Sequence, residues 1–275
     1  MSILVEPSAA LLLEKSSTES QQRAVERLAA LQPKPMVLDA TEMKRLLLPE
    51  MKLVKAPERP TEFSLNDLAA AWASRFNILQ QLLLRRPETA GAASIAAASG
   101  KCTVIGQVKK LKNVELEDPT GSMELICDKK LLPDDVIAVR GFAANGVMQA
   151  EDIFFPDIHL NAVRQLEGTL GVGTEADFMI RPVATEFWEI NGTTILVHKA
   201  DWKALADALM IQEVQVPVEL LRRRHLAAPP WDVMEPQPDI FIAAGMPGVN
   251  ANYKGTAIIG IGEKSIIDLA KREAC

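Results

Sequence analysis

The stretch from Thr103 to Phe155 decides the fold of this chain, and it reads TVIGQVKKLKNVELEDPTGSMELICDKKLLPDDVIAVRGFAANGVMQAEDIFF. Short runs of β-branched and aromatic residues alternate in it with clusters of Asp, Asn, Pro and Gly. This pattern predicts short strands joined by tight turns. The five expected strands are Thr103 to Val108, Val114 to Glu117, Met123 to Cys127, Val136 to Phe142 and Val147 to Phe155.

Five short strands in a segment of this length are typical of a small closed barrel of the oligonucleotide/oligosaccharide-binding type. We therefore assign residues 101–158 to such a barrel. Helical patterns precede it, and a mixture of helix and strand patterns follows it. The chain as a whole is expected to be α+β or mainly β.

A well-marked helix precedes the barrel, within residues 61–100. Ser64 and Asp67 form a capping-box pattern, and Phe63 and Leu68 occupy the positions of a hydrophobic staple. Pro87 ends the pattern, and the Ala-, Gly- and Ser-rich residues that follow it predict a linker into the barrel.

Apolar residues recur along this helix every three or four positions and predict one broad stripe. The stripe packs either on its own domain or on a partner subunit. Its aromatic residues, Trp72 and Phe76, are therefore candidate partner-binding residues. The stripe consists of Leu65, Leu68, Ala69, Trp72, Phe76, Leu79 and Leu83.

Residues 1–60 are expected to form a small helical appendage and a linker. Helical spacing indicates a helix from Thr18 to Leu31, and a short strand is expected from Met36 to Leu38. A second short helix, capped by Asp39 or Thr41, should end before Pro49. The prolines and mixed charges from Lys52 to Pro60 predict a linker.

Residues 159–275 carry an α+β pattern. Strands are expected at Phe187 to Ile190, Thr194 to His198, Ile240 to Ala244 and Thr256 to Ile261. Helices are expected at Asp201 to Met210, from Pro217 to Arg224 and from Ser265 onward. Gly168, Gly171 and Gly173 lack the order of a phosphate-binding loop, so they predict a flexible loop.

Composition sets wide limits on function. With a formal net charge of -6 over 275 residues, the chain offers no overall attraction to nucleic acid, so any such contact needs a local basic patch. Three cysteines without CxxC spacing suggest neither a disulfide framework nor a zinc site. No signal-type or membrane-spanning stretch is evident, and we expect a cytoplasmic protein without membrane contact.

Two blocks of motifs resemble the small subunit of archaeal DNA polymerase D, which shares its design with the B subunits of eukaryotic replicative polymerases. The first block contains Phe76-Asn77-Ile78-Leu79, Leu84-Arg85-Arg86, Val104 to Val108, Leu116 to Gly121, Leu132 to Val136, Arg140-Gly141 and Ile153 to Ile158. The second contains Leu196-Val197-His198, Leu220 to Leu226, Pro238 to Phe241 and Tyr253-Lys254-Gly255. The resemblance implies a barrel followed by a reduced calcineurin-like phosphoesterase domain.

The same resemblance implies that the phosphoesterase chemistry is lost. Active members are expected to bind two metal ions through an Asp-x-His, a Gly-Asp, an Asn-His-Asp, a later His and a Gly-His-x-His. The Gly-Asp and Asn-His-Asp motifs have no counterpart here, and Gly245-Met246-Pro247-Gly248 replaces the last motif. Only the vestigial His198 remains, and the neighbouring cation of Lys199 opposes metal binding. We therefore expect no catalytic residue, no metal and no cofactor.

One further segment, Asp157-Ile158-His159, has the Asp-x-His spacing of a first phosphoesterase motif. The preceding Phe154-Phe155-Pro156 instead identifies it as the end of the barrel. We interpret Asp157 and His159 accordingly as structural residues.

Two basic groups remain as candidate binding residues. The first group is a run of three arginines, whose guanidinium groups can bind phosphates or a partner's carboxylates. The same run can instead interact favourably with the dipole at the C-terminal end of its own helix. The lysines lie where such barrels often approach single strands, although base stacking would need exposed aromatics. The partner-binding candidates are Arg222, Arg223 and Arg224, and the nucleic-acid-binding candidates are Lys109, Lys110 and Lys112.

The sequence thus predicts a non-catalytic accessory subunit of a replicative DNA polymerase. Its expected partner is the large catalytic subunit, and it reaches DNA indirectly through that complex. Losing half of a phosphoesterase sandwich should leave apolar surface uncovered, which favours a stable partner. The alternatives are an active metal-dependent phosphoesterase or 3'-5' exonuclease subunit, and a stand-alone single-stranded-DNA-binding protein.

Overall fold

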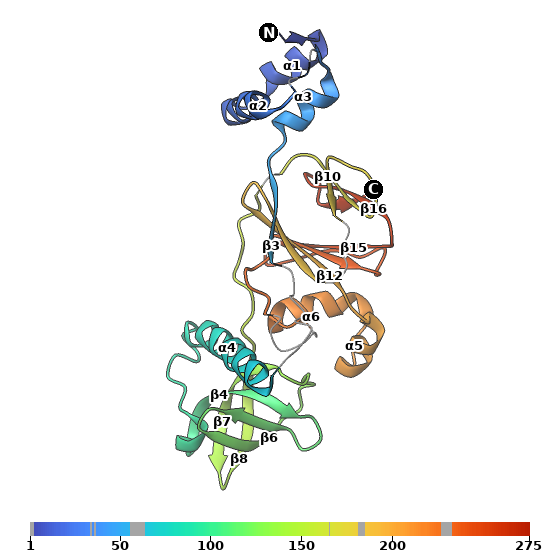
Figure 1. Ribbon diagram of the computed structural model, residues 1–275. Coiled ribbons are helices and arrows are strands. Elements are labelled where there is room, and N and C mark those ends of the chain that lie inside the picture. The colour runs from blue at the N-terminus through green and yellow to red at the C-terminus, as the bar shows by residue number, and fades with distance from the viewer. Residues whose placement is uncertain are drawn as a thin grey trace.

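The computed structural model describes residues 3–33, 35, 37–55, 64–164, 166–180, 185–226 and 233–275. Figure 1 shows, from top to bottom, a helical N-terminal part, a pair of β-sheets with two helices, and a barrel that carries a long helix, although the barrel precedes most of the sheet strands in the chain. Helices and sheets both contribute substantially, which confirms a mixed α+β architecture. No helix in the described ranges is long and apolar enough to span a membrane.

The N-terminal part contains three helices and a two-stranded parallel sheet. The helices are α1 (Pro7–Lys15), α2 (Thr18–Ala30) and α3 (Ala40–Leu47), and the strands are β1 (Leu4–Val5) and β2 (Val37–Leu38). The Asp39 carboxylate accepts the backbone N–H of Glu42 at 2.8 Å, so Asp39 caps α3. A small core holds these elements together, formed by Ala9, Ala24, Leu38, Met43 and Leu46.

Strand β3 (Met51–Lys55) differs from the sequence prediction, which places Lys52 to Pro60 in a linker. β3 pairs antiparallel with β11 (Glu186–Ile190), so it becomes an edge strand of a sheet whose other strands come much later in the chain. The prediction fails because the stabilising contact is non-local. The remaining linker residues, 56–60, and the expected staple residue Phe63 lie outside the described ranges.

Helix α4 (Leu65–Leu84) begins at the predicted capping box. The Ser64 hydroxyl accepts the Asp67 N–H at 3.1 Å, and the Asp67 carboxylate accepts the Ser64 N–H at 3.0 Å. Its second half packs on barrel strands through a cluster that includes Phe76, Leu79, Leu83, Ile105 and Val136. A short 3-10 turn, η1 (Ile95–Ala97), then leads into the barrel.

The barrel consists of the five strands that the sequence predicts. They are β4 (Gly100–Lys110), β5 (Glu115–Asp118), β6 (Gly121–Ile126), β7 (Val136–Ala144) and β8 (Val147–Phe154), and they close in the order β4-β5-β6-β8-β7. The Asp118 side chain accepts the N–H groups of Thr120 and Gly121 and fixes the β5–β6 turn. Gly141 sits at a register shift between β7 and β8, where an added Cβ would lie 2.0 Å from the Gln149 carbonyl oxygen.

The second half of the chain builds two sheets. The six-stranded sheet has the order β14-β15-β13-β12-β11-β3, and the four-stranded sheet has the order β10-β9-β16-β17. The helical elements are α5 (Trp202–Leu209), η2 (Glu213–Gln215) and α6 (Val216–Arg223). The remaining strands are β9 (Thr169–Val172), β10 (Phe178–Ile180), β12 (Thr193–Lys199), β13 (Ile240–Ala244), β14 (Asn250–Tyr253), β15 (Thr256–Ile261), β16 (Ser265–Asp268) and β17 (Glu273–Ala274).

Two predictions for this region are wrong. The segment from Ser265 forms strand β16 rather than a helix, because Ile267 enters the core while the strand pairs with β9. The expected flexible loop around Gly171 is largely strand β9, in which an added Cβ at Gly171 would lie 2.2 Å from the Thr174 carbonyl oxygen.

Both faces of the six-stranded sheet are covered. Phe187, Phe241 and Ile258 pack against α5 and α6 on one face. Ile195 and Ile242 pack on the other face against the four-stranded sheet. The uncovered apolar surface expected from the loss of half a sandwich is therefore not found on the central strands β12, β13 and β15, although Leu53 and Val54 of edge strand β3 are exposed. Exposed apolar side chains occur elsewhere, chiefly on strand edges, loops and α4.

A buried ion pair joins the barrel to the sheets. The Arg223 guanidinium at the end of α6 pairs with Asp135 of the barrel, and the two side chains are only 4% and 0% exposed. Arg223 also donates to the Lys130 carbonyl oxygen at 2.9 Å, and its guanidinium lies 4.4 Å from the centre of the Phe155 ring. The neighbouring Arg224 donates to the carbonyl oxygens of Asp157 and Met234, which follow the barrel and α6 respectively.

Removing Arg223 should therefore cost much more stability than removing its neighbour. We expect Arg223→Ala to lower the free energy of unfolding by about 3 to 5 kcal/mol, because it leaves Asp135 buried without its cation. The matched control is Arg222→Ala, which removes a partly exposed ion pair with Glu219 and should cost at most about 1 kcal/mol. Urea unfolding of both variants measures the difference, and equal losses would contradict this role for the pair.

Candidate functional site

The vestigial ligand position, His198, is buried at the end of β12. Its Nδ1 lies 2.7 Å from the Thr185 hydroxyl, and its ring packs against Trp202 and Phe241 with ring centroids 5.5 and 6.1 Å away. Burial lowers the pKa of His198 to about 4, so the ring is neutral at pH 7. Its Nε2 is buried without a hydrogen-bond partner.

Packed side chains occupy the sheet edge beside His198. Strands β12 and β13 are parallel, so their carboxyl ends meet at one edge of the sheet near His198. At that edge the Trp202 indole donates to the Ala244 carbonyl oxygen at 2.8 Å, and Met246 of the Gly-Met-Pro-Gly segment is buried. Across the described ranges, no three His, Cys, Asp or Glu side chains gather in a way that could hold a metal ion.

The Asp-x-His segment after the barrel has a structural position. Asp157 accepts the Lys254 ammonium at 2.6 Å and the Tyr253 hydroxyl at 3.1 Å. Its backbone N–H donates to the Arg222 carbonyl oxygen at 2.8 Å. His159 is exposed, and its backbone exchanges hydrogen bonds with the Gln237 side chain. Asp157 thus fastens the barrel's exit to the end of α6 and to the β14–β15 turn.

The arginine run divides by burial. Arg223 and Arg224 use their guanidinium groups inside the chain, as described above, and neither faces solvent. Arg222 keeps 37% of its side chain exposed and pairs with Glu219 at 3.3 Å. Partner binding by this run stays a prediction, and among the three residues only Arg222 has the exposure to contribute to it directly.

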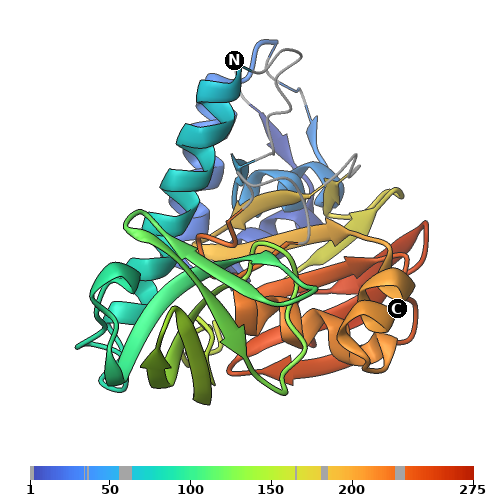
Figure 2. The ribbon, with the colours of Figure 1, turned by 90° about the horizontal axis from the view of Figure 1, so that it is seen from below.

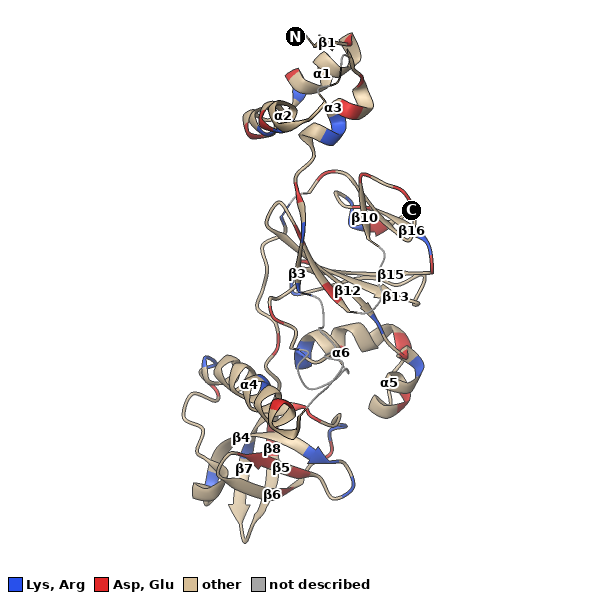
Figure 3. Ribbon diagram, in the orientation of Figure 1, with Lys and Arg blue, Asp and Glu red and all other residues tan. Residues whose placement is uncertain are grey.

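The three candidate lysines lie at an end of the barrel next to carboxylates. Lys109 pairs with Glu117, and Lys110 pairs with Glu115 at 2.5 Å. Lys112 is exposed beside a hollow of about 310 Å³, which Glu115 and Glu124 also line. Figure 3 shows the acidic strand β5 beside the basic end of β4. Lys109 and Lys110 are therefore compensated by carboxylates, and DNA binding by the three lysines stays a prediction.

The aromatic residues of the α4 stripe differ in position. Phe76 is buried against the barrel, so it acts as a core residue in this chain. Trp72 lies in the first half of the helix and is 41% exposed. Of the two candidates, only Trp72 is accessible to a partner.

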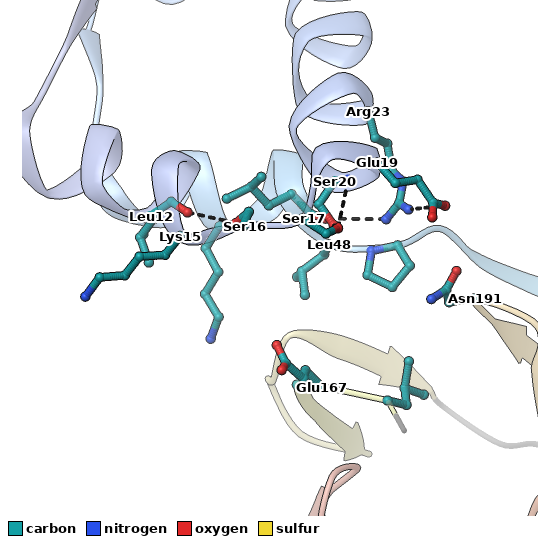
Figure 4. Close-up of a pocket in the computed structure, with 15 residues that line it drawn as sticks. Leu12, Lys15, Ser16, Ser17, Glu19, Ser20, Arg23, Leu48, Glu167 and Asn191 are labelled. Atoms are coloured by element: carbon teal, nitrogen blue, oxygen red, sulfur yellow. Dashed lines mark hydrogen bonds and ion pairs between the residues drawn. The ribbon is translucent and has the colours of Figure 1, made fainter. Parts of the chain in front are cut away.

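A further cleft lies between the N-terminal helices and the residues around Gly168 and Asn191, which precede β9 and join β11 to β12. It encloses about 650 Å³ and is lined by Lys15, Arg23, Lys44, Glu19 and Glu167 among others. Figure 4 shows that Arg23 turns to Glu19, while Glu167 approaches from the opposite wall. Lys44 pairs with Asp177 at 2.6 Å. Since its charges are largely compensated, the cleft offers no evident site for a charged ligand.

The sequence does not reveal the buried polar cluster beside the Arg223–Asp135 pair. Arg75 of α4 is buried and donates to the Asp134 carbonyl oxygen at 2.6 Å. Burial raises the pKa of Asp135 to about 6, while the charge of Arg223 opposes that shift. The one signal in the sequence is Arg75 itself, because it is a charged residue directly beside Phe76 of the apolar stripe.

His198 should make the chain sensitive to acid. Its pKa lies below that of an unfolded histidine, about 6.5. Its contribution to stability is therefore present above that pH and is lost as the pH falls toward 4. We expect His198→Phe to gain stability relative to the unmodified chain as the pH falls from 7 to 4.5, measured by urea unfolding. A difference that does not change with pH would contradict this assignment.

Comparisons with known proteins indicate a family relationship. No protein-family model matches the chain. Over 118 residues it is 29% identical to the DNA polymerase II small subunit of Methanothermobacter thermautotrophicus, and this match covers 36% of this chain and 24% of that protein. Over 167 residues it is 26% identical to the DNA polymerase II small subunit of Archaeoglobus fulgidus, which covers 54% of this chain and 34% of that protein.

The chain is therefore similar over these stretches to two archaeal DNA polymerase small subunits, which confirms the resemblance found in its motifs. The matches span only about a quarter to a third of the length of these two relatives.

Proposed function

We propose that this chain is a non-catalytic accessory subunit of an archaeal-type replicative DNA polymerase, and that it acts as a scaffold for the large catalytic subunit. The similarity to two proteins named as DNA polymerase II small subunits carries the proposal. Within this proposal the chain is cytoplasmic and reaches DNA indirectly, through the complex.

The proposal includes an assignment of the two β-rich bodies. The closed five-stranded barrel, residues 101–158, corresponds to an oligonucleotide/oligosaccharide-binding barrel. Residues 159–275 correspond to a reduced calcineurin-like phosphoesterase domain, to which β3 of the N-terminal segment adds an edge strand. The short strands, their closed order and the tight turns between them support the first assignment. The order of the motifs along the chain supports the second.

The chemistry of the His198 surroundings supports a non-catalytic role. A two-metal phosphoesterase site needs several carboxylates and imidazoles that converge on the ions and on an activating water. Here the single matching imidazole faces aromatic rings and a threonine hydroxyl, and Asp157 is engaged by Lys254 and Tyr253. This arrangement disfavours the alternative of an active phosphoesterase or exonuclease.

The charge pattern of the barrel disfavours the other alternative, a stand-alone single-strand binder. Such proteins combine a positively charged groove with exposed aromatic residues. Lys109 and Lys110 are paired with carboxylates, and Phe155 is buried. Phe142 is exposed on β7, but the nearest cation in register, Lys101, is paired with Glu151.

Co-expression with the large catalytic subunit from the same genome tests the proposal. We expect the two chains to elute together in size-exclusion chromatography and to remain associated at moderate salt, since a scaffold interface depends mainly on apolar burial. Separate elution at all concentrations tested would count against an accessory-subunit role.

A nuclease assay tests the non-catalytic part independently. We expect no manganese-dependent cleavage of single-stranded DNA above the background of a buffer control, because the ligands for two metal ions do not converge at His198. Cleavage that disappears in His198→Ala would show that the chain is an active enzyme.

A further inference from the structure

The first half of α4, from Leu65 to Ser74, has little contact with the rest of the chain, and we call it the free half of α4. Its residues are mostly exposed, with Leu65 at 86% and Trp72 at 41%, whereas the second half packs on the barrel. Figure 2 shows the free half extending beyond the barrel strands. This capped half of the helix thus has no apolar cluster packed against it among the residues that the structure describes.

The apolar stripe continues across both halves of the helix. Leu65, Leu68 and Trp72 follow the spacing i, i+3 and i+7, which places them on one face. That face is continuous with Phe76, which is buried in the contact between α4 and the barrel. The apolar face of α4 that packs on the barrel through Phe76 therefore continues into the free half, where a second protein surface could pack on it.

The free half carries little charge. Its single charged side chain is Asp67, which is held in the capping box by Ser64, and its other polar residues are Asn66 and Ser74. Figure 3 shows this ribbon in the colour of uncharged residues over nearly all of its length. At 100° per residue, Leu65, Leu68 and Trp72 lie on the side of the helix away from Asp67 and Ser74, so the apolar side chains form one face.

We propose that the free half of α4 is a docking helix that inserts Leu65, Leu68 and Trp72 into an uncharged, apolar groove of the polymerase large subunit. This inference rests on the proposed function and identifies the surface through which it operates. Insertion of an apolar helix face into a hydrophobic groove, read as anchors at i, i+3 and i+7, is a general mode of recognition. Trp72 is the expected main anchor, since tryptophan is enriched among residues that dominate binding energy.

A groove accounts for the free half better than a second copy of the chain does. The segment is about 15 Å long at 1.5 Å per residue, so two such segments side by side bury little surface. A stable interface needs about 800 Å² from each partner. A groove encloses the helix from several sides, and the small side chains of Ala69, Ala70 and Ala73 permit that close approach.

The test measures affinity of the full chain for the large subunit. The variants are Trp72→Ala and the double change Leu65→Ser with Leu68→Ser, and the matched control is Ile78→Ser. Ile78 is 39% exposed on the same helix, but it lies about 240° around the helix axis from Trp72. All three changes affect exposed or partly exposed side chains, so unchanged thermal unfolding can be verified for each variant.

We expect Trp72→Ala and the double variant to weaken binding at least tenfold, while Ile78→Ser binds like the unmodified chain. Hydrogen exchange should slow over residues 64–74 when the large subunit is added. If all variants bind equally well, the docking helix is wrong but the accessory-subunit role stands. If the unmodified chain fails to bind, or instead forms a homodimer that Trp72→Ala disperses, both proposals fall.

Discussion

The arrangement of this molecule depends on one buried ion pair, between Arg223 of α6 and Asp135 of the barrel. Withdrawing two charges from water is costly, and the pair is retained only where further hydrogen bonds satisfy both groups. Arg223 meets this condition through Glu219, the Lys130 carbonyl oxygen and the Phe155 ring. Asp135 meets it only in part, because its Oδ2 also accepts the Leu132 N–H at 2.7 Å while its Oδ1 is buried without a hydrogen-bond partner. Because these partners belong to both the barrel and α6, the pair fixes how the barrel sits on the sheets.

Other polar groups also connect the barrel to the sheets. Arg224 donates to the carbonyl oxygens of Asp157 and Met234. Asp157, which directly follows the barrel, accepts hydrogen bonds from Lys254 and Tyr253. The most basic run of the chain and its one Asp-x-His motif are thus largely engaged in internal contacts. Little uncompensated charge remains among these residues for recognising DNA or a charged ligand, whereas the first half of α4 exposes the apolar side chains of Leu65 and Trp72.

Local patterns predicted much of the fold. Alternating residues and the Asp118 turn determine the barrel strands, and the Ser64–Asp67 box determines the start of α4. The errors arise where partners are distant: β3 is stabilised by β11, and β16 by β9, so neither sequence segment reveals its strand pairing. The candidate site shows the same limit. The stripe identified Trp72 and Phe76 together, but only the fold shows that one faces solvent and the other the barrel.

The packing around His198 leaves no room for a hydrated metal site at the same place. A two-metal centre requires a polar, hydrated pocket at the carboxyl ends of parallel strands, and such a pocket cannot also be a close-packed core. At that edge this chain places Trp202, Phe241 and Met246, with the indole satisfied by the Ala244 carbonyl oxygen. Restoring single ligands there would leave polar groups buried among aromatic rings. A two-metal site at this edge would therefore require a different core as well as a different set of side chains.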